Sequence, residues 1–164
     1  MALDSLRALY VDQLRDLYSA ENQILKALPQ MIAKTRHQEL RTAFEDHLRA
    51  TEEQVRRLDG IFQELGEKPS GHHCKGMEGL LKEGQEMMGE KSDPDVLDAA
   101  LIAAAQRVEH YEMAGYGCVR TYARMLGLSD QQATLQRTLD EEGDTDHLLT
   151  ELAERVINRD AQSS

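Results

Sequence analysis

Carboxylates stand on two helical stripes of this sequence at positions where apolar residues are expected. Glu109 and Glu112 are three residues apart, and Glu142 and Asp146 are four apart. These spacings place both members of each pair on one face of a helix. A buried carboxylate is costly unless it is paired, protonated or bound to a metal ion. Four carboxylates on two core-facing stripes therefore predict a metal site.

The distances of these residues from a hairpin turn predict that the four carboxylates meet. Glu112 lies about 15 residues before the turn at Gly127 and Glu142 lies about 14 after it, so the helical rise places them side by side. Glu109 and Asp146 are level in the same way, each about 18 residues from the turn. Carboxylate oxygens suit iron and manganese, so two such ions with bridging carboxylates would neutralise the group.

The first half of the chain supplies further candidate ligands. Glu21 is the only charge on its stripe and lies about 16 residues before a first turn, and Gln54 is level with it, about 17 residues beyond that turn. His47 has the better ligand chemistry but lies roughly 10 Å off the level of Glu21. Taken alone, Glu21 could be a surface residue and His47 a hydrogen-bonded core histidine. The choice between His47 and Gln54 stays open, and the predicted metal ligands are Glu21, His47, Glu109, Glu112, Glu142 and Asp146.

Other polar residues near these positions have simpler interpretations. Thr51, Gln54 and His110 are expected to support the ligands, since His110 follows Glu109 directly and so points about 100° away from it. The run His72-His73-Cys74 could be an adventitious metal site but is more typical of a polar loop. Tyrosines on the stripes are expected in the core with a hydroxyl partner. One of them near the site could act in redox chemistry, the candidates being Tyr10, Tyr18, Tyr111 and Tyr116.

Apolar residues at steps of three and four predict the helices that position these groups. A tight turn near Arg36-His37 makes the first two helices antiparallel neighbours. Asp93-Pro94 is a typical helix start. The glycine-rich residues 66–93 are predicted to form a crossover with a short helix from Met77 to Gly89. The long helices are predicted at about 4–35, 38–65, 94–126 and 129–157, with a frayed tail from Asn158.

The predicted fold is all-α, in a single domain of residues 1–164. No strand pattern is present, and two antiparallel hairpins are joined by a long crossover that contains a short fifth helix. This connection of two hairpins by one long crossover is the topology of ferritin-like four-helix bundles.

Composition and charge exclude several classes of function. The formal net charge of -11 argues against nucleic-acid binding, which needs a basic face. No apolar run approaches the roughly 20 residues of a membrane span, and the start of the chain lacks the order of a signal peptide. Cys74 and Cys118 form no Cys-x-x-Cys motif and are expected to be free thiols in a reducing cytoplasm.

The motifs of the chain, taken together, resemble those of the bacterial YciE/YciF-type stress proteins over nearly its whole length. The residues that show the resemblance are Tyr18-Ser-Ala-Glu21-Asn-Gln, Phe44-x-x-His47-Leu-x-x-Thr51-x-x-Gln54, Cys74-x-x-Met77-Glu-Gly-Leu80, Asp98-Ala-Ala-Leu-Ile-Ala-Ala-Ala-Gln106, Glu109-His-Tyr-Glu112, and Leu139-Asp-Glu-Glu142 with Asp146. The resemblance implies a ferritin-like, rubrerythrin-related four-helix protein that is cytoplasmic and homodimeric, with a di-metal carboxylate site. It implies no particular reaction.

The chain departs from the wider rubrerythrin pattern in its ligand motifs. The second helix lacks Glu-x-x-His on its stripe, and the fourth has Glu142-x-x-x-Asp146 instead. A site with fewer histidines and more carboxylates is implied. No rubredoxin-like cysteine pairs are present, which excludes internal electron delivery of that kind.

Three hypotheses of function follow from the sequence. The first is a di-iron protein that reacts with oxygen or peroxide under stress, with two iron ions expected and manganese as an alternative. The second is a bundle whose carboxylates hold metal without turnover. The third is an interaction protein for which the acidic bundle is a scaffold. Spare apolar residues on the crossover, Leu80, Leu81, Met87 and Met88, favour a homodimer in each case.

Overall fold

The structure is a computed structural model that describes residues 3–164. Its regular elements are amphipathic helices. Their bounds are α1 Leu6–Lys34, α2 Gln38–Leu65, α3 Lys75–Gly89, α4 Pro94–Met125, α5 Ser129–Leu152, a π-helical turn at Ala153–Ile157 and α6 Asn158–Ser163. Within residues 3–164 there is no strand, which confirms the all-α prediction. The long helices begin and end within a few residues of the predicted bounds.

Local chemistry explains where the helices start and stop. The Ser5 hydroxyl accepts a hydrogen bond from the amide of Ala8, and the Asp93 carboxylate accepts one from the amide of Asp95. These side chains satisfy amides that have no partner within the helix. At the other end of α2, Gly66 adopts the left-handed conformation with φ 66°, which ends the helix at low steric cost.

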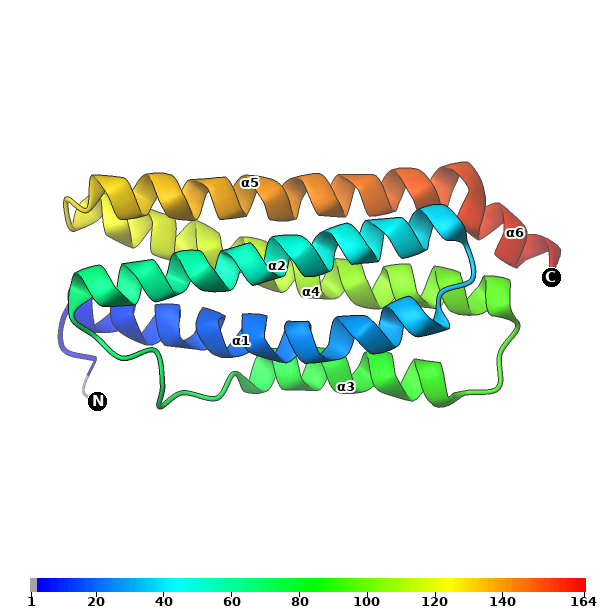
Figure 1. The fold of residues 1–164 in the computed structure, drawn as a ribbon, viewed down its shortest axis with the longest axis horizontal. Coiled ribbons are helices and arrows are strands. Elements are labelled where there is room, and N and C mark those ends of the chain that lie inside the picture. Colours follow the sequence, from blue (N-terminus) through cyan, green and yellow to red (C-terminus); the bar gives the residue numbers. More distant parts are fainter. Residues whose placement is uncertain (1–2) are drawn as a thin grey trace.

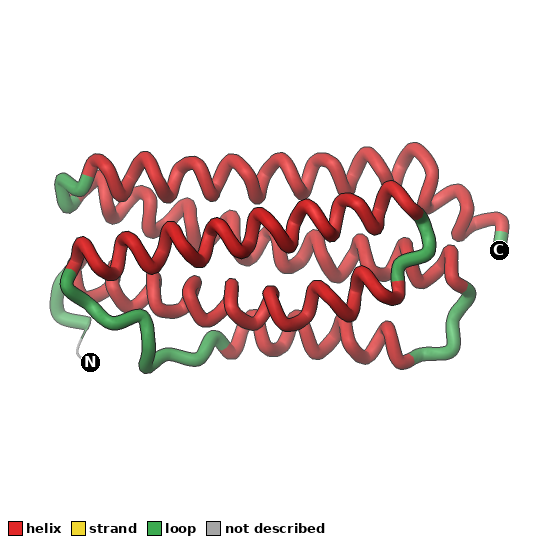
Figure 2. Tube along the Cα trace, viewed as in Figure 1, coloured by secondary structure: helices red, strands yellow, loops and turns green. Residues whose placement is uncertain are grey.

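The helices form two antiparallel hairpins, α1 with α2 and α4 with α5, that pack side by side (Figure 1). The segment between them returns along the length of the bundle, and its helix α3 packs against α1 and α4. The connecting loops lie at the two ends of the bundle and beside α3 (Figure 2). Residues near the middle of each long helix are therefore surrounded by the other long helices.

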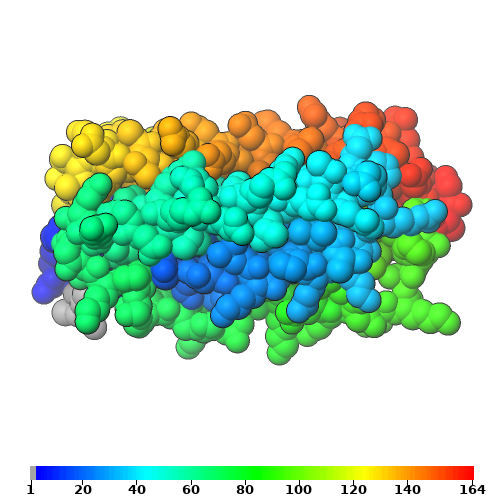
Figure 3. Space-filling view, viewed as in Figure 1, coloured from blue at the N-terminus to red at the C-terminus, as the bar shows by residue number. Residues whose placement is uncertain are grey.

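A polar layer divides the apolar core into two clusters. One cluster contains Ile24, Leu28 and Phe44, and the other contains Leu14, Leu58 and Phe62. Between them the long helices place polar side chains at almost zero exposure. On the face shown in Figure 3, α2 and α1 lie in front and pack closely together. The layer corresponds to the carboxylate stretch that the sequence singled out.

Two details differ from the sequence prediction. The tail expected to fray from Asn158 is helical to Ser163, because the π-helical turn continues the chain and buries Ile157 against the core. The apolar residues of α3 are half-buried, and Leu80, Leu81 and Met88 pack on the core of their own chain. The core of the same chain therefore covers part of the apolar surface that motivated the homodimer, which stays a prediction.

No helix within residues 3–164 combines the length and the apolar character that crossing a membrane requires.

Candidate metal centre

Four side chains from three helices converge in the polar layer. α2 contributes His47, α4 contributes Glu109 and Glu112, and α5 contributes Glu142. One ligand atom of each lies within 4.8 Å of one ligand atom of every other. Exposure is 4% for His47 and 0–1% for the three glutamates. The three-residue spacing on α4 and the matched level on α5 bring the carboxylates together, as the sequence predicted.

Most polar atoms of this group lack hydrogen-bond partners. Both ring nitrogens of His47, both carboxylate oxygens of Glu109 and of Glu112, and one oxygen of Glu142 are buried without one. His47 Nδ1 lies 3.1 Å from Glu109 Oε1, but the two atoms are not aligned for a hydrogen bond. Buried polar atoms are rarely left in this way, and each exception calls for an explanation such as an ion.

Burial makes this group electrostatically unfavourable as free carboxylates. Burial first, and then the neighbouring charge of Glu142, raise the pKa of Glu109 and of Glu112 well above the ordinary value of a glutamate. Burial lowers the pKa of His47, so the ring is neutral and free to act as a ligand. A cation placed among these groups would reverse the penalty. One histidine and three carboxylates form a donor set that fits iron or manganese.

Glu21 and Tyr116 lie beside the four-residue group, not within it. The Tyr116 hydroxyl donates a hydrogen bond of 2.5 Å to Glu21 Oε1, while Glu21 Oε2 is buried without a partner. Burial, followed by the charge of Glu142, raises the pKa of Glu21 to about 8. Glu21 is completely buried, so the structure does not place it on the surface. Its free oxygen leaves it available as a ligand for a second ion.

Both residues that the sequence left open on α2 reach the polar layer. His47 joins the compact group, whereas the Gln54 side-chain amide donates to Glu142 Oε1 at 2.5 Å and to Glu141 Oε2 at 3.2 Å. Glu141 is in turn held by both terminal nitrogens of Arg57 at 2.8 Å. Gln54 therefore orients Glu142 from outside the compact group. Counting levels placed Gln54, and not His47, level with Glu21 and the other carboxylates, whereas the compact group contains His47 and lacks both Gln54 and Glu21.

Asp146 lies outside the four-residue group. Its Oδ1 accepts a hydrogen bond of 3.2 Å from the amide of Gln106 and lies 3.4 Å from His110 Nδ1. The Asp146 side chain is 13% exposed and that of His110 is 64% exposed. Axial level alone suggested that Asp146 would join Glu109. The Gln106 amide instead holds its carboxylate at the edge of the α4–α5 interface.

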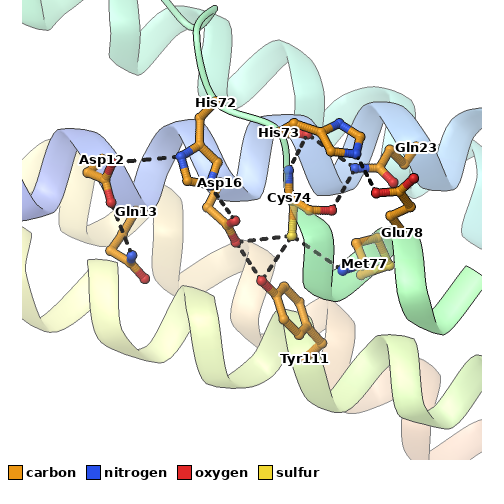
Figure 4. Close-up of polar contacts among 11 residues, drawn as sticks. Asp12, Gln13, Asp16, Gln23, His72, His73, Cys74, Met77, Glu78 and Tyr111 are labelled. Atoms are coloured by element: carbon orange, nitrogen blue, oxygen red, sulfur yellow. Dashed lines mark hydrogen bonds and ion pairs between the residues drawn. The ribbon is translucent and has the colours of Figure 1, made fainter. Parts of the chain in front are cut away.

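Thr51 and the His72–Cys74 run have partners of their own. The Thr51 hydroxyl donates to the backbone carbonyl of His47 at 2.9 Å, within the same helix. His72 contacts Asp16 and His73 contacts Glu78, each at a separation of at most 2.9 Å, and the ring of each points to a different place (Figure 4). Over residues 3–164 the only metal-type group is the one around His47. His72 and His73 lie in a polar loop, and Cys74 is buried where α3 begins.

One buried carboxylate escaped the sequence analysis. Asp98 on α4 is 1% exposed, and its two oxygens accept backbone amide hydrogen bonds from Arg36 at 3.0 Å and from His37 at 2.7 Å. Asp98 lies on the same stripe as Glu109, at steps of three and four through Ile102. Extending that stripe backward would have found it. It ties α4 to the α1–α2 turn.

The fold and the site define an all-helical bundle with a histidine and glutamate cluster buried at its middle. The model of the family described as "Domain of unknown function (DUF892)" matches residues 5–162. The chain is 39% identical to Protein YciF of Escherichia coli strain K12 over 164 residues, which cover 99% of each protein. The chain therefore belongs to the DUF892 family, and the resemblance inferred from its motifs is confirmed.

Solved structures support the same relationship. The crystal structure of the E. coli stress protein YciF matches with a TM-score of 0.91 at 39% identity, over 95% of this chain and 99% of that one. YcfI from Rhodopseudomonas palustris, described as a candidate structural protein, matches with a TM-score of 0.87 at 43% identity, over 92% and 97%. A protein from Xanthomonas campestris pv. campestris matches at 0.76 and 18% identity over 97% and 98%, a likeness of fold alone.

Proposed function

We propose that this protein is a ferritin-like di-metal carboxylate protein that binds two iron ions, with manganese as an alternative, and reacts with peroxide or oxygen under stress. One observation supports it above all others. His47, Glu109, Glu112 and Glu142 are buried at 4% exposure or less, their ligand atoms lie within 4.8 Å, and most of those atoms have no hydrogen-bond partner. The stress role comes from the similarity to E. coli YciF.

The residues have distinct parts in this proposal. His47, Glu109, Glu112 and Glu142 would hold one ion, and Glu21 with the carboxylates it faces would hold the second. Bound iron would supply the capacity to exchange electrons with an oxidant. Gln54 keeps one oxygen of Glu142 fixed through its 2.5 Å hydrogen bond, and Tyr116 does the same for Glu21. The surrounding apolar clusters exclude water, which strengthens the attraction between ligands and cation.

A second candidate function is a bundle without turnover, and one feature favours it. The pKa values of Glu21, Glu109 and Glu112 are all raised, chiefly by burial, so the carboxyls can remain protonated and uncharged without metal. A neutral cluster of this kind would allow the fold to persist as a structural protein. The description of YcfI points the same way for that relative. The two functions differ in whether metal stabilises the fold and whether peroxide is consumed.

The test measures metal content and thermal melting on the full chain. Iron(II) or manganese(II) is added without oxygen to the wild type and to the Glu109→Gln/Glu142→Gln variant, with Asp146→Asn as a variant outside the compact group. Metal should raise the melting temperature of the wild type and of Asp146→Asn, because ligands that bind only the folded state stabilise it. The double variant should show no rise.

Equal rises in the wild type and the double variant would place the metal elsewhere and contradict the proposal. Peroxide decay in the iron-loaded wild type then separates the two functions. Decay that the double variant lacks supports the redox protein. Metal binding without decay supports the structural bundle.

A further inference from the structure

A second polar cluster lies on the flank of α4, where α1 and the start of α3 meet it (Figure 4). The Tyr111 hydroxyl donates to Asp16 Oδ2 at 2.6 Å, and the Cys74 thiol donates to the same oxygen at 3.3 Å. Cys74 Sγ also lies 2.9 Å from the Tyr111 hydroxyl oxygen. A phenol, a thiol and a carboxylate are thus in mutual contact. None of the functions considered above uses them.

The cluster is built around the tyrosine ring with little free space. A Cβ atom on Gly76 would lie 2.7 Å from Tyr111 Cε2, so the absence of a side chain lets the first turn of α3 approach the ring. Cys74 is fully buried and caps the same helix by accepting from the amide of Met77 at 3.4 Å. The ring and the thiol are therefore held in one arrangement.

The chemistry of these groups is not that of a nucleophile or a metal site. Burial raises the pKa of the Cys74 thiol. The thiol therefore keeps its proton near neutral pH, whereas nucleophilic and metal-ligating cysteines are thiolates. A phenol bonded to a carboxylate at 2.6 Å is instead arranged to lose an electron and a proton together, because the carboxylate receives the proton.

The position of Tyr111 connects this cluster to the candidate metal centre. Tyr111 directly precedes Glu112 and follows Glu109 by two residues on α4. Consecutive Cα atoms are about 3.8 Å apart, so the backbone of Tyr111 adjoins a candidate ligand, while its hydroxyl contacts Asp16 and Cys74. On the other side Asp16 reaches the surface, with a side chain 18% exposed and paired to His72 at 2.9 Å. The cluster therefore connects a residue next to the candidate ligands with a partly exposed carboxylate.

We infer that Tyr111, Cys74 and Asp16 form a proton-coupled electron relay that carries electrons from small-molecule thiols to the buried centre. The inference rests on the proposed function. One electron leaves Tyr111 for the centre, and the phenolic proton moves to Asp16. The Cys74 hydrogen atom then moves from sulfur to the phenoxyl oxygen, which restores Tyr111 and leaves a thiyl radical.

The cycle closes without a net change in the protein. A small-molecule thiolate at the surface gives one electron to the Cys74 thiyl radical, and Asp16 returns its proton to the sulfur. The thiolate becomes a thiyl radical, and two of these combine into a disulfide. The electron accepted at the centre is matched by one thiolate oxidised. This route would deliver electrons to the centre in place of rubredoxin-like cysteine pairs, which the sequence lacks.

The test uses full-length protein loaded with iron without oxygen and then mixed with hydrogen peroxide. Freeze-quench electron paramagnetic resonance follows radicals, and mass spectrometry follows oxidation of each cysteine. In the wild type, Cys74 should be oxidised although it is buried, and added glutathione should prevent this. Cys74→Ala should accumulate a tyrosyl radical, and Tyr111→Phe should leave Cys74 reduced. Cys118→Ala and Tyr122→Phe are the matched controls and should behave as the wild type.

A metal-free arm separates failure of the relay from failure of the proposed function. A photogenerated ruthenium(III) polypyridyl complex oxidises the apo protein, and Cys74 oxidation is compared among the wild type, Tyr111→Phe and Asp16→Asn, each checked for helix content by circular dichroism. Loss of Cys74 oxidation in the two variants supports the relay even if no metal binds. Cys74 oxidation at the wild-type rate in folded Tyr111→Phe, or oxidation confined to Cys118, would overturn it.

Discussion

Two buried carboxylates on one helix, Asp98 near the start of α4 and Glu109 at its middle, have opposite surroundings. Both are at most 1% exposed. Asp98 accepts two backbone hydrogen bonds from the α1–α2 turn, whereas neither oxygen of Glu109 has a partner. Burial is therefore common to both and cannot by itself identify a metal ligand. The unpartnered oxygens distinguish the middle of the bundle, where the proposed cation would bind, from the turn, where backbone amides already satisfy the carboxylate.

The largest expected effect is on the pH dependence of the metal-free protein. Glu21 has a pKa raised from 4.5 to about 8, so between these values the folded state binds protons that the unfolded state has released. The free energy of unfolding should therefore fall as pH rises from about 4.5 to about 8. The slope should be about 1.4 kcal/mol per pH unit for each carboxyl so shifted.

Urea unfolding of the apo protein between pH 4.5 and 8 measures this slope. Added manganese(II) at pH 8 should restore the lost stability, because metal replaces the protons. An unfolding free energy that rises across the same interval would show that the central carboxylates are ionised and satisfied by partners.

Asp98→Asn should destabilise the metal-free protein by about 2–3 kcal/mol, because it replaces one acceptor of a charge-assisted pair with a donor facing a backbone amide. The change leaves the central layer untouched. Urea unfolding at pH 7 gives the magnitude, and the rise in melting temperature on metal addition should equal that of the wild type. A smaller rise would mean that the turn and the centre are coupled.

Glu109→Gln is the same chemical change and should have the opposite sign. It removes a buried carboxylate whose neighbours are also acidic, so the apo protein should gain about 1 kcal/mol at pH 8 from relief of like-charge repulsion and desolvation. Comparing its unfolding curve with that of Asp98→Asn is the sharpest test of the contrast. If both substitutions destabilise by similar amounts, the two sites do not differ as described.

The smallest effect is expected at Thr51, whose side chain is as fully buried as those of the cluster. Its hydroxyl already has a partner in the His47 carbonyl. Thr51→Val should cost no more than about 1 kcal/mol, since that carbonyl keeps its helical amide partner. Metal-dependent stabilisation should be unchanged. Loss of the metal effect in this variant would assign Thr51 a direct part in the centre.

Helical periodicity and level counting predicted much of this molecule and missed what they cannot encode. Steps of three and four gave the helices, and equal distances from a turn placed Glu112 beside Glu142. Counting gives the axial level of a residue but not the direction in which its side chain leaves the helix. That is why Asp146, level with Glu109, is held apart from it by Gln106.

Contacts among residues from three distant segments could not be predicted from the sequence, for a different reason. Asp16, Cys74 and Tyr111 meet only because the crossover lays α3 against α1 and α4. Nothing in the local sequence of any one of them specifies the other two. The tyrosine was expected to have a hydroxyl partner, and it has one, but the identity of the partner depends on the tertiary arrangement.

The clamp of Asp98 on the α1–α2 turn also determines where the chain can change in length. These hydrogen bonds fix the position of α4 along its axis. The interval from Asp98 to Glu109, about 16 Å at the helical rise, therefore sets the distance between the turn and the centre. One residue inserted within that interval would swing Glu109 by about 100° and out of the polar layer. Residues inserted in the loops before or after α3 lie outside this interval and would leave the residues of the centre in register.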